Sequence, residues 1–340
     1  MRTGWIVGVL TAAALLAGCG ESGGEGARQA AKDDGVLTFS VLATENSRTQ
    51  QADWAPLFAD MEKATGLEVK PFFQNNYTGL IEAMRFGQID AGWFSNQSGL
   101  EAVRRADGEV FVRSSDPSGV DGYNSLLITN TNSGITLDDV LKCDKTLSFG
   151  LGDAKSTSGT LAPMAFLFTP RGIDPQQCFR TVRSANHESN MLSVANGVLQ
   201  VATNNSTAYD ILKDRKPDVM AKVKIIWTSP RLPEDPLIWR KDLDPAVKEK
   251  VRQFFLTYGA GEGAEAERQR AVLARLSFGT FRPADNSHLI PVREMEAAEA
   301  LAAARRTNDQ AKIAEAQRNL DAVRSERAAA EARAGVKPAA

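Results

Sequence analysis

Residues 149–160 read FGLGDAKSTSGT and hold the pattern on which the fold assignment depends. The run begins at the end of a β-rich segment and leads into an apolar helical stretch at 161–168. Ser156, Thr157 and Ser158 stand at the junction, where the first backbone N–H groups and the dipole of a helix favour an anion. No Gly-Lys-Ser/Thr ending follows, which excludes a nucleotide-binding P-loop. The junction predicts a strand-to-helix unit of an α/β fold, although the same residues also suit a plain helix N-cap.

Strand and helix patterns alternate on both sides of this segment. Helical spacing covers 54–65, which ends at Gly66, and 77–86. The β-rich runs lie at 36–42, 67–73, 89–94, 110–112, 125–129 and 147–150. The alternation predicts α/β architecture with helices flanking a mostly parallel sheet.

Two breaks in the pattern divide the chain into lobes. Turn residues gather at 130–134, and Pro230, Pro233 and Pro236 interrupt the stretch 229–240. Two crossings between domains make a two-lobed protein with a hinge and a cleft. We expect lobe 1 to span 36–130 and 236–294, and lobe 2 to span 131–235.

Composition excludes several classes of protein. The chain has 340 residues, a formal net charge of −2, 43% hydrophobic residues, three cysteines and two histidines. This apolar fraction is normal for a globular protein and excludes disorder throughout the chain. The near-neutral charge argues against a nucleic-acid partner. We expect no metal site and no cofactor.

The N-terminus carries export signals. Arg2 precedes a short apolar run at 5–16, which has the length of a signal-peptide core and is too short to span a bilayer. The run ends in Leu16-Ala17-Gly18-Cys19, which resembles a bacterial lipobox. We expect a signal peptide at 1–18, a lipid on Cys19, a flexible tether at 19–35 and a periplasmic, membrane-anchored protein. An ordinary secretory peptide is the alternative.

The two remaining cysteines, Cys143 and Cys178, each precede a strand-like run. An exported protein matures in an oxidising compartment, and two neighbouring parallel strands would bring the thiols together. The pattern favours a structural disulfide over two inert thiols.

The tail at 295–340 predicts a helical extension. It is rich in Ala, Glu, Arg and Gln, and Ile313, Ala316, Leu320 and Val323 recur at helical spacing. A helix packed on its own domain, a solvated arm and a helix that forms a homodimer all remain open.

Further polar segments follow predicted strands. His187 lies in a polar run at 184–190, Thr207 ends another at 201–207, and Asp235 lies near the presumed hinge. The carboxyl ends of strands are where α/β proteins bind ligands. A lone histidine is more often structural, so these residues alone predict a site only in outline.

Together these segments resemble the periplasmic phosphonate-binding proteins of ABC transporters. The resemblance covers nearly all of the mature chain. It rests on Asp60-Met61-Glu62-Lys63, Tyr77 with Gly79, Met84-Arg85-Phe86, Trp93, Ser156-Thr157-Ser158-Gly159, His187-Glu188, Val194-Ala195-Asn196, Ala202-Thr203-Asn204-Asn205, Asp235-Pro236 and Trp239-Arg240.

The resemblance implies a type II periplasmic-binding fold whose two lobes close on a ligand. It implies that Ser156, Thr157, Ser158 and His187 hold the phosphonate oxygens and that Tyr77 lines the cleft. It also implies a ligand contact at Phe94, and two positions at the amino end of 2-aminoethylphosphonate, Thr207 and Asp235. An ABC permease is the implied protein partner.

Two of these positions depart from the family pattern. Phe94 stands where a tyrosine is common, and Thr207 stands where a second acid is expected. A carboxylate–ammonium hydrogen bond contributes about 1.5–3 kcal/mol, so one lost acid lowers affinity roughly tenfold or more. We therefore expect an intact phosphonate end and a weakened preference for an amino group.

Other functions remain as alternatives. The same fold binds other ligands, such as a phosphate ester, another oxyanion or a molecule like a thiamine precursor. A hydrolase would use Ser156 or Ser158 with His187, but no Gly-x-Ser-x-Gly elbow is present. A purely structural envelope lipoprotein is favoured only by the helical tail. We expect a binding protein and no enzymatic activity.

Overall fold

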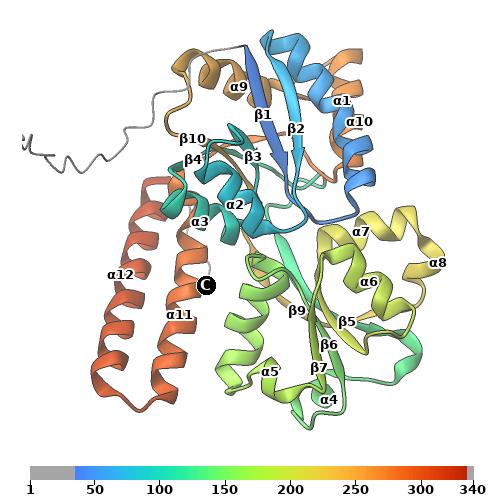
Figure 1. Cartoon of the computed structure of the whole chain (residues 1–340), viewed down its shortest axis with the longest axis vertical. Coiled ribbons are helices and arrows are strands. Elements are labelled where there is room, and N and C mark those ends of the chain that lie inside the picture. The colour runs from blue at the N-terminus through green and yellow to red at the C-terminus, as the bar shows by residue number, and fades with distance from the viewer. Residues whose placement is uncertain (1–34, 335–340) are drawn as a thin grey trace, which may run out of the picture.

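The computed structural model describes residues 35–334 as two α/β lobes with a helical hairpin beside them (Figure 1). The predicted signal peptide, Cys19 and all of the tether except Gly35 lie outside the described residues. Among the residues described, no helix is both long enough and apolar enough to cross a membrane.

Lobe 1 is built on a six-stranded sheet with the order β11-β4-β10-β3-β1-β2. β1 pairs in parallel with β2 and β3, whereas β10 runs antiparallel to β3 and β4. The strands are β1 (Val36–Val41), β2 (Glu68–Phe73), β3 (Ala91–Trp93), β4 (Gly108–Arg113), β10 (Pro236–Arg240) and β11 (Arg282–Pro283).

Lobe 2 is built on a five-stranded sheet with the order β7-β6-β8-β5-β9. β6 is parallel to β7 and β8, and β5 is antiparallel to β8 and β9. The strands are β5 (Tyr123–Asn130), β6 (Ser148–Leu151), β7 (Thr181–Ser184), β8 (Val201–Asn205) and β9 (Val223–Leu232). Both sheets are thus mixed, and the expectation of a mostly parallel sheet is wrong. β5 is the first strand after the chain crosses into lobe 2, and β10 is the first strand after it returns to lobe 1. Each therefore runs antiparallel to its neighbours in the sheet it joins.

The first crossing lies earlier than expected. β5 pairs with β8 and β9, so the chain leaves lobe 1 between Arg113 and Tyr123 and not at 130–134. The second crossing, between Leu232 and Pro236, agrees with the predicted return at 236. Pro230 lies inside β9, which is an edge strand and therefore tolerates a residue without an N–H.

Helices cover both sheets. Lobe 1 carries α1 (Ser47–Thr65), α2 (Tyr77–Arg85), α3 (Asn96–Arg105), α9 (Pro245–Thr257), α10 (Ala264–Arg275) and the 3-10 turn η5 (Asn286–Leu289). Lobe 2 carries α4 (Leu137–Leu141), α5 (Pro175–Cys178), α6 (His187–Ala195), α7 (Ser206–Arg215), α8 (Pro217–Met220) and the turns η1 (Thr131–Ser133), η2 (Thr157–Leu161), η3 (Met164–Phe168) and η4 (Thr169–Arg171).

The cores form where the predicted periodicities place apolar side chains. In lobe 1, the rings of Phe39 and Trp54 have centroids 6.0 Å apart and join β1 to α1. Gly66 ends α1 with a φ of 72°, as its sequence position predicts. In lobe 2, Phe149 of β6 stacks on Phe179 with centroids 4.3 Å apart.

The predicted helical tail is a hairpin of α11 (Ile290–Arg306) and α12 (Gln310–Ala334). Figure 1 shows it along one side of the molecule, where α11 touches α3 of lobe 1 and η3 of lobe 2. Leu320 of α12 packs against Ala297 and Leu301 of α11, with Ile313 at the edge of this cluster. The apolar seam is therefore covered within the chain, which leaves the homodimer hypothesis without the surface on which it rested.

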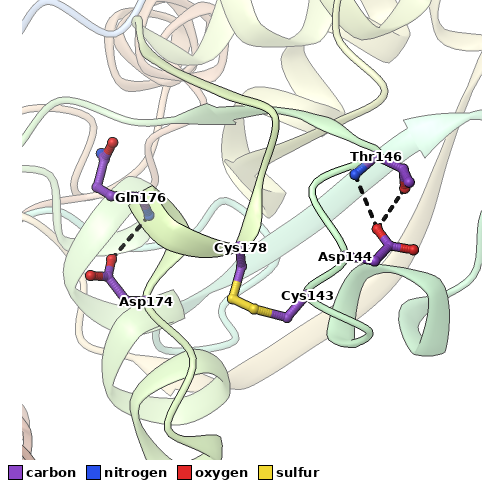
Figure 2. Close-up of a disulfide and its surroundings, with 6 residues drawn as sticks. All are labelled: Cys143, Asp144, Thr146, Asp174, Gln176 and Cys178. Atoms are coloured by element: carbon purple, nitrogen blue, oxygen red, sulfur yellow. Dashed lines mark hydrogen bonds between the residues drawn. A yellow bond between two sulfur atoms is a disulfide. The ribbon is translucent and has the colours of Figure 1, made fainter.

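Cys143 and Cys178 form the predicted disulfide (Figure 2). Cys143 lies in the loop before β6, and Cys178 ends α5 just before β7. β6 and β7 are neighbouring parallel strands, which is the arrangement expected from the sequence. The disulfide lies in lobe 2, and neither cysteine lines the cleft described below.

Candidate functional site

A cleft with an empty volume of about 790 Å³ lies between the lobes. Both lobes supply its walls. Six of the eight side chains that the sequence predicts to bind ligand line it, namely Tyr77, Ser156, Ser158, His187, Thr207 and Asp235. These residues lie at the N-terminal ends of α2, η2, α6 and α7 and at the crossing between β9 and β10, and the structure brings them to one cavity.

The serine loop between β6 and η2 depends on two glycines. A Cβ on Gly152 would lie 2.5 Å from the Cα of Gly159, so only glycine allows the loop to fold back over the end of β6. Ser156 caps η2, because its Oγ accepts a hydrogen bond of 3.0 Å from the Gly159 N–H. Asn205 Nδ2 donates to Ser158 Oγ at 3.3 Å. Both hydroxyls are buried at the wall of the cleft.

His187 is the first residue of α6 and is 3% exposed. Its Nδ1 is buried and has no hydrogen-bond partner among residues 35–334. Burial lowers the pKa of His187 to about 4, so the imidazole is neutral at pH 7 and has one N–H to donate. A buried polar atom without a partner is costly, and a ligand oxygen in the cleft is the partner that removes this cost.

Tyr77 closes the same end of the cleft from lobe 1. It begins α2, and its backbone N–H donates to Asp153 Oδ2 of lobe 2 at 3.1 Å. Burial, reinforced by the charges of Asp235 and Asp153, raises the pKa of the Tyr77 hydroxyl. The hydroxyl therefore remains a proton donor throughout the physiological pH range.

Asp235 provides a carboxylate at the hinge. Its Oδ1 accepts hydrogen bonds from Asn96 Nδ2 and from the Tyr123 hydroxyl, both at 3.1 Å. No lysine or arginine in the described part of the chain forms a salt bridge with it. Burial and the neighbouring charge of Glu234 raise the pKa of Asp235 well above its usual value. A cationic group of a ligand beside this carboxylate would offset both the cost of burying its charge and the repulsion from Glu234.

Glu234 adds a second acid next to the hinge. Gly122 N–H and Ser114 Oγ donate to its two oxygens at 3.1 and 3.3 Å. Burial, with the charge of Asp116, raises the pKa of Glu234 to about 7. Glu234 also lines the cleft, and the sequence analysis did not single it out.

Two predicted ligand contacts do not line the cleft. Thr157 is fully buried, and its Oγ1 accepts a hydrogen bond of 2.8 Å from the Gln97 N–H of lobe 1. Phe94 is also fully buried in the core of lobe 1. Successive residues along a strand point to opposite faces, so Trp93 reaches the cleft and Phe94 points away from it.

Tyr123 is a cleft residue that sequence reasoning missed. It is the first residue of β5, directly after the first crossing, and it lines the cleft with its hydroxyl on Asp235. The available signal was the position of a tyrosine at the start of a strand that leaves the hinge. Placing the crossing at 130–134 concealed this signal, because it put Tyr123 within the range of lobe 1 and away from a crossing.

The arrangement suits binding and not bond cleavage. Hydroxyl and imidazole donors and the Asp235 carboxylate line the same cleft. Within the described part of the chain, no acid is hydrogen-bonded to His187 Nδ1 to orient the ring as a general base for Ser156 or Ser158. In the described residues, no group of three or more His, Cys, Asp or Glu side chains is placed to hold a metal ion.

Comparison with known proteins agrees with this geometry. Residues 39–289 match the family model of the periplasmic substrate-binding protein of phosphonate ABC transporters. The chain is 40% identical over 267 residues to the phosphonates-binding periplasmic protein of Escherichia coli, which covers 78% of this chain and 77% of that protein. The chain belongs to this family.

Solved structures of similar proteins have the same fold as this chain. A binding protein component of an ABC phosphonate transporter from Pseudomonas aeruginosa is 37% identical, with a TM-score of 0.82 over 87% of this chain and 99% of that one. A Prochlorococcus marinus protein solved with methylphosphonate has a TM-score of 0.68 at 18% identity, over 76% of this chain and 96% of that one. The predicted type II periplasmic-binding fold is confirmed, and the family is one of solute-binding proteins, not enzymes.

Proposed function

We propose that this protein captures a phosphonate, or a related small phosphorus oxyanion, and delivers it to the permease of an ABC transporter. The observation that carries the proposal is the unpartnered Nδ1 of His187 in the same cavity as the hydroxyls of Ser156, Ser158 and Tyr77. Neutral donors fixed around one point, beside the N-termini of α2 and α6, favour an anion.

Closure of the lobes is the step that secures the ligand. Besides the bond from the Tyr77 N–H to Asp153, two hydrogen bonds join the lobes at the serine loop, from Ser95 Oγ to the Lys155 carbonyl at 2.9 Å and from Gln97 N–H to Thr157 Oγ1 at 2.8 Å. Serine and histidine donors belong to lobe 2, and Tyr77 belongs to lobe 1. Only the closed state makes both sets of ligand contacts, so binding shifts the hinge equilibrium towards closure.

The tail end of the cleft supports a weakened preference for an amino group. Asp235 offers one carboxylate there, and Thr207, at the start of α7, offers a neutral hydroxyl. The departure at Thr207 also favours the second candidate, a binding protein for another oxyanion or a phosphate ester. In both cases the donors around His187 hold the oxyanion.

We also propose that the mature protein is a periplasmic lipoprotein anchored through Cys19. The support is the lipobox-like Leu16-Ala17-Gly18-Cys19 at the end of a short apolar run. Cells that express the full chain and are fed a radiolabelled fatty acid should label it, and Cys19→Ser should abolish the label. A fully labelled Cys19→Ser protein would refute the anchor.

Calorimetric titration of the chain without residues 1–19 tests the binding function. Methylphosphonate and 2-aminoethylphosphonate should bind, and sulfate should not. His187→Ala should weaken the binding of both phosphonates, whereas the matched variant Ser189→Ala, an exposed residue on the same helix, should not. Absence of binding to every phosphonate would refute the proposal, and sulfate binding alone would favour the second candidate.

A further inference from the structure

Four charged residues of the cleft wall contact one another, and we call them the mouth cluster because two of them, Arg215 and Arg275, also reach solvent. The four are Glu45, Asp53, Arg215 and Arg275, and all four line the cleft. The two nitrogens of Arg215 lie 3.2 Å from Glu45 Oε2 and 2.8 Å from Asp53 Oδ2. Arg275 contacts the other oxygen of Asp53 at 3.0 Å, and Arg215 donates to the Arg275 carbonyl at 2.7 Å.

Arg215 is the member of the mouth cluster that comes from lobe 2. It ends α7, whereas Glu45 follows β1, Asp53 lies in α1 and Arg275 ends α10. Figure 1 shows α7 facing α1 and α10 across the junction of the lobes. All three bonds of Arg215 therefore exist only while the lobes are closed. The two chain segments that connect the lobes, between β4 and β5 and between β9 and β10, do not include Arg215, and the second of them contains Asp235.

The cleft runs along one face of α7 to reach this cluster. Thr207, Ala208, Ile211 and Arg215 line it, and a helix rise of 1.5 Å per residue places Arg215 about 12 Å from Thr207. Trp54, Leu276 and Phe278 of lobe 1 line the same cleft. The polar inner part of the cleft thus leads into a mainly apolar outer part, and the mouth cluster closes its end.

Resting on the proposed function, we propose that Arg215 determines ligand length by closing the outer end of the cleft. A compact oxyanion fits the inner, polar part and leaves the bonds of Arg215 intact. A ligand with a long apolar tail extends along α7 and displaces Arg215 from Glu45 and Asp53. The protein therefore selects phosphonates with short substituents.

Charge and burial explain why the displacement is costly. The Glu45 and Asp53 side chains are 10% and 11% exposed, and that of Arg215 is 31% exposed. Removing one partner of a desolvated charge pair leaves the other charge buried and speeds dissociation. Because apparent affinity scales with the closed fraction, loss of Arg215 should lower it by about tenfold for a ligand that permits closure.

The test compares Arg215→Ala with Arg268→Ala, which removes another ion-paired arginine whose partners, Asp60 and Glu265, both lie in lobe 1. Calorimetry measures the affinity of each protein for methylphosphonate and n-hexylphosphonate. Arg215→Ala should lower the affinity for methylphosphonate by about tenfold. It should leave the affinity for n-hexylphosphonate unchanged or raise it, and Arg268→Ala should change neither affinity. Thermal unfolding without ligand reports whether each variant is folded.

An equal loss for both ligands, or no loss for either, overturns the role of Arg215 in length selection. The same comparison is made with methyl sulfate and n-hexyl sulfate. If the unaltered protein binds sulfates and no phosphonate, the proposed function fails while length selection is still measured. If it binds no member of either pair, both proposals are overturned.

Discussion

Replacing Asp235 by asparagine should reverse the ligand preference of the cleft. The substituted amide keeps the shape of the side chain, and its oxygen still accepts the 3.1 Å hydrogen bonds that Asn96 and Tyr123 donate to Asp235. What the variant loses is the negative charge that faces the ligand tail. A hydrogen bond to a charged group contributes about 1.5–3 kcal/mol, so 2-aminoethylphosphonate should bind about 10- to 150-fold more weakly.

Methylphosphonate carries no cation, and its affinity for Asp235→Asn should be unchanged or higher, since a buried negative charge near an anion is removed. Calorimetric titration of both ligands against both proteins at one pH gives the four affinities. The informative quantity is the ratio of the affinities for the two ligands, compared between the two proteins. An equal loss for both ligands, or full retention of 2-aminoethylphosphonate binding, would refute the assignment of Asp235 to the amino end.

The same substitution has a consequence for stability without ligand. Folding raises the pKa of Asp235 above its ordinary value of 3.8, so the folded protein holds this proton more tightly than the unfolded chain. The carboxylate therefore costs stability once the pH exceeds its unfolded pKa, and the cost grows up to the folded pKa. Asp235→Asn should unfold at a higher temperature than the unaltered protein at pH 8. Near pH 4 the difference should disappear.

Three further substitutions test separate parts of the structure. Thr207→Glu should raise the preference for 2-aminoethylphosphonate over methylphosphonate about tenfold in calorimetry, because it adds a second carboxylate at the tail end; an unchanged ratio would contradict this placement. Gly152→Ala puts a Cβ 2.5 Å from the Cα of Gly159 and should cost about 1–3 kcal/mol in chemical denaturation and weaken phosphonate binding, so unchanged stability would argue against the close approach. Replacing both Cys143 and Cys178 by serine removes a disulfide between residues 35 positions apart and should lower the free energy of unfolding by about 3–4 kcal/mol. The affinity for phosphonate should not change, and a lower affinity would show that the disulfide supports the cleft.

Local sequence patterns predicted many of the elements that the structure contains, but not β10, which lies in the stretch 229–240 that the prolines were expected to interrupt. Gly66 ends α1, and Ser156 caps the turn after β6, because caps and turns depend on the conformation of a few consecutive residues. The spacing of Ile313, Ala316, Leu320 and Val323 predicted a helix with one packed face, but not the partner of that face.

Sheet membership was not predictable in the same way. The run that became β5 is β-rich in either lobe, and only its hydrogen bonds to β8 and β9 assign it to lobe 2. The error placed Tyr123 away from the cleft. The choice between Trp93 and Phe94 likewise depends on which face of the sheet meets the cleft, which two adjacent aromatic residues do not reveal.

The sequence by itself determined the α/β class, the family and the strand-to-helix junction at 156–158, since these follow from local periodicity and from short matched segments. The tertiary structure decided where the lobes cross, that Tyr123 meets Asp235 in the cleft while Phe94 is buried in the core of lobe 1, and that Arg215 reaches Glu45 and Asp53 across the lobes. Arg215 bonds Glu45 across 170 positions of sequence. Contacts of this kind arise when two lobes close on each other, and no pattern within either segment encodes the distance between them.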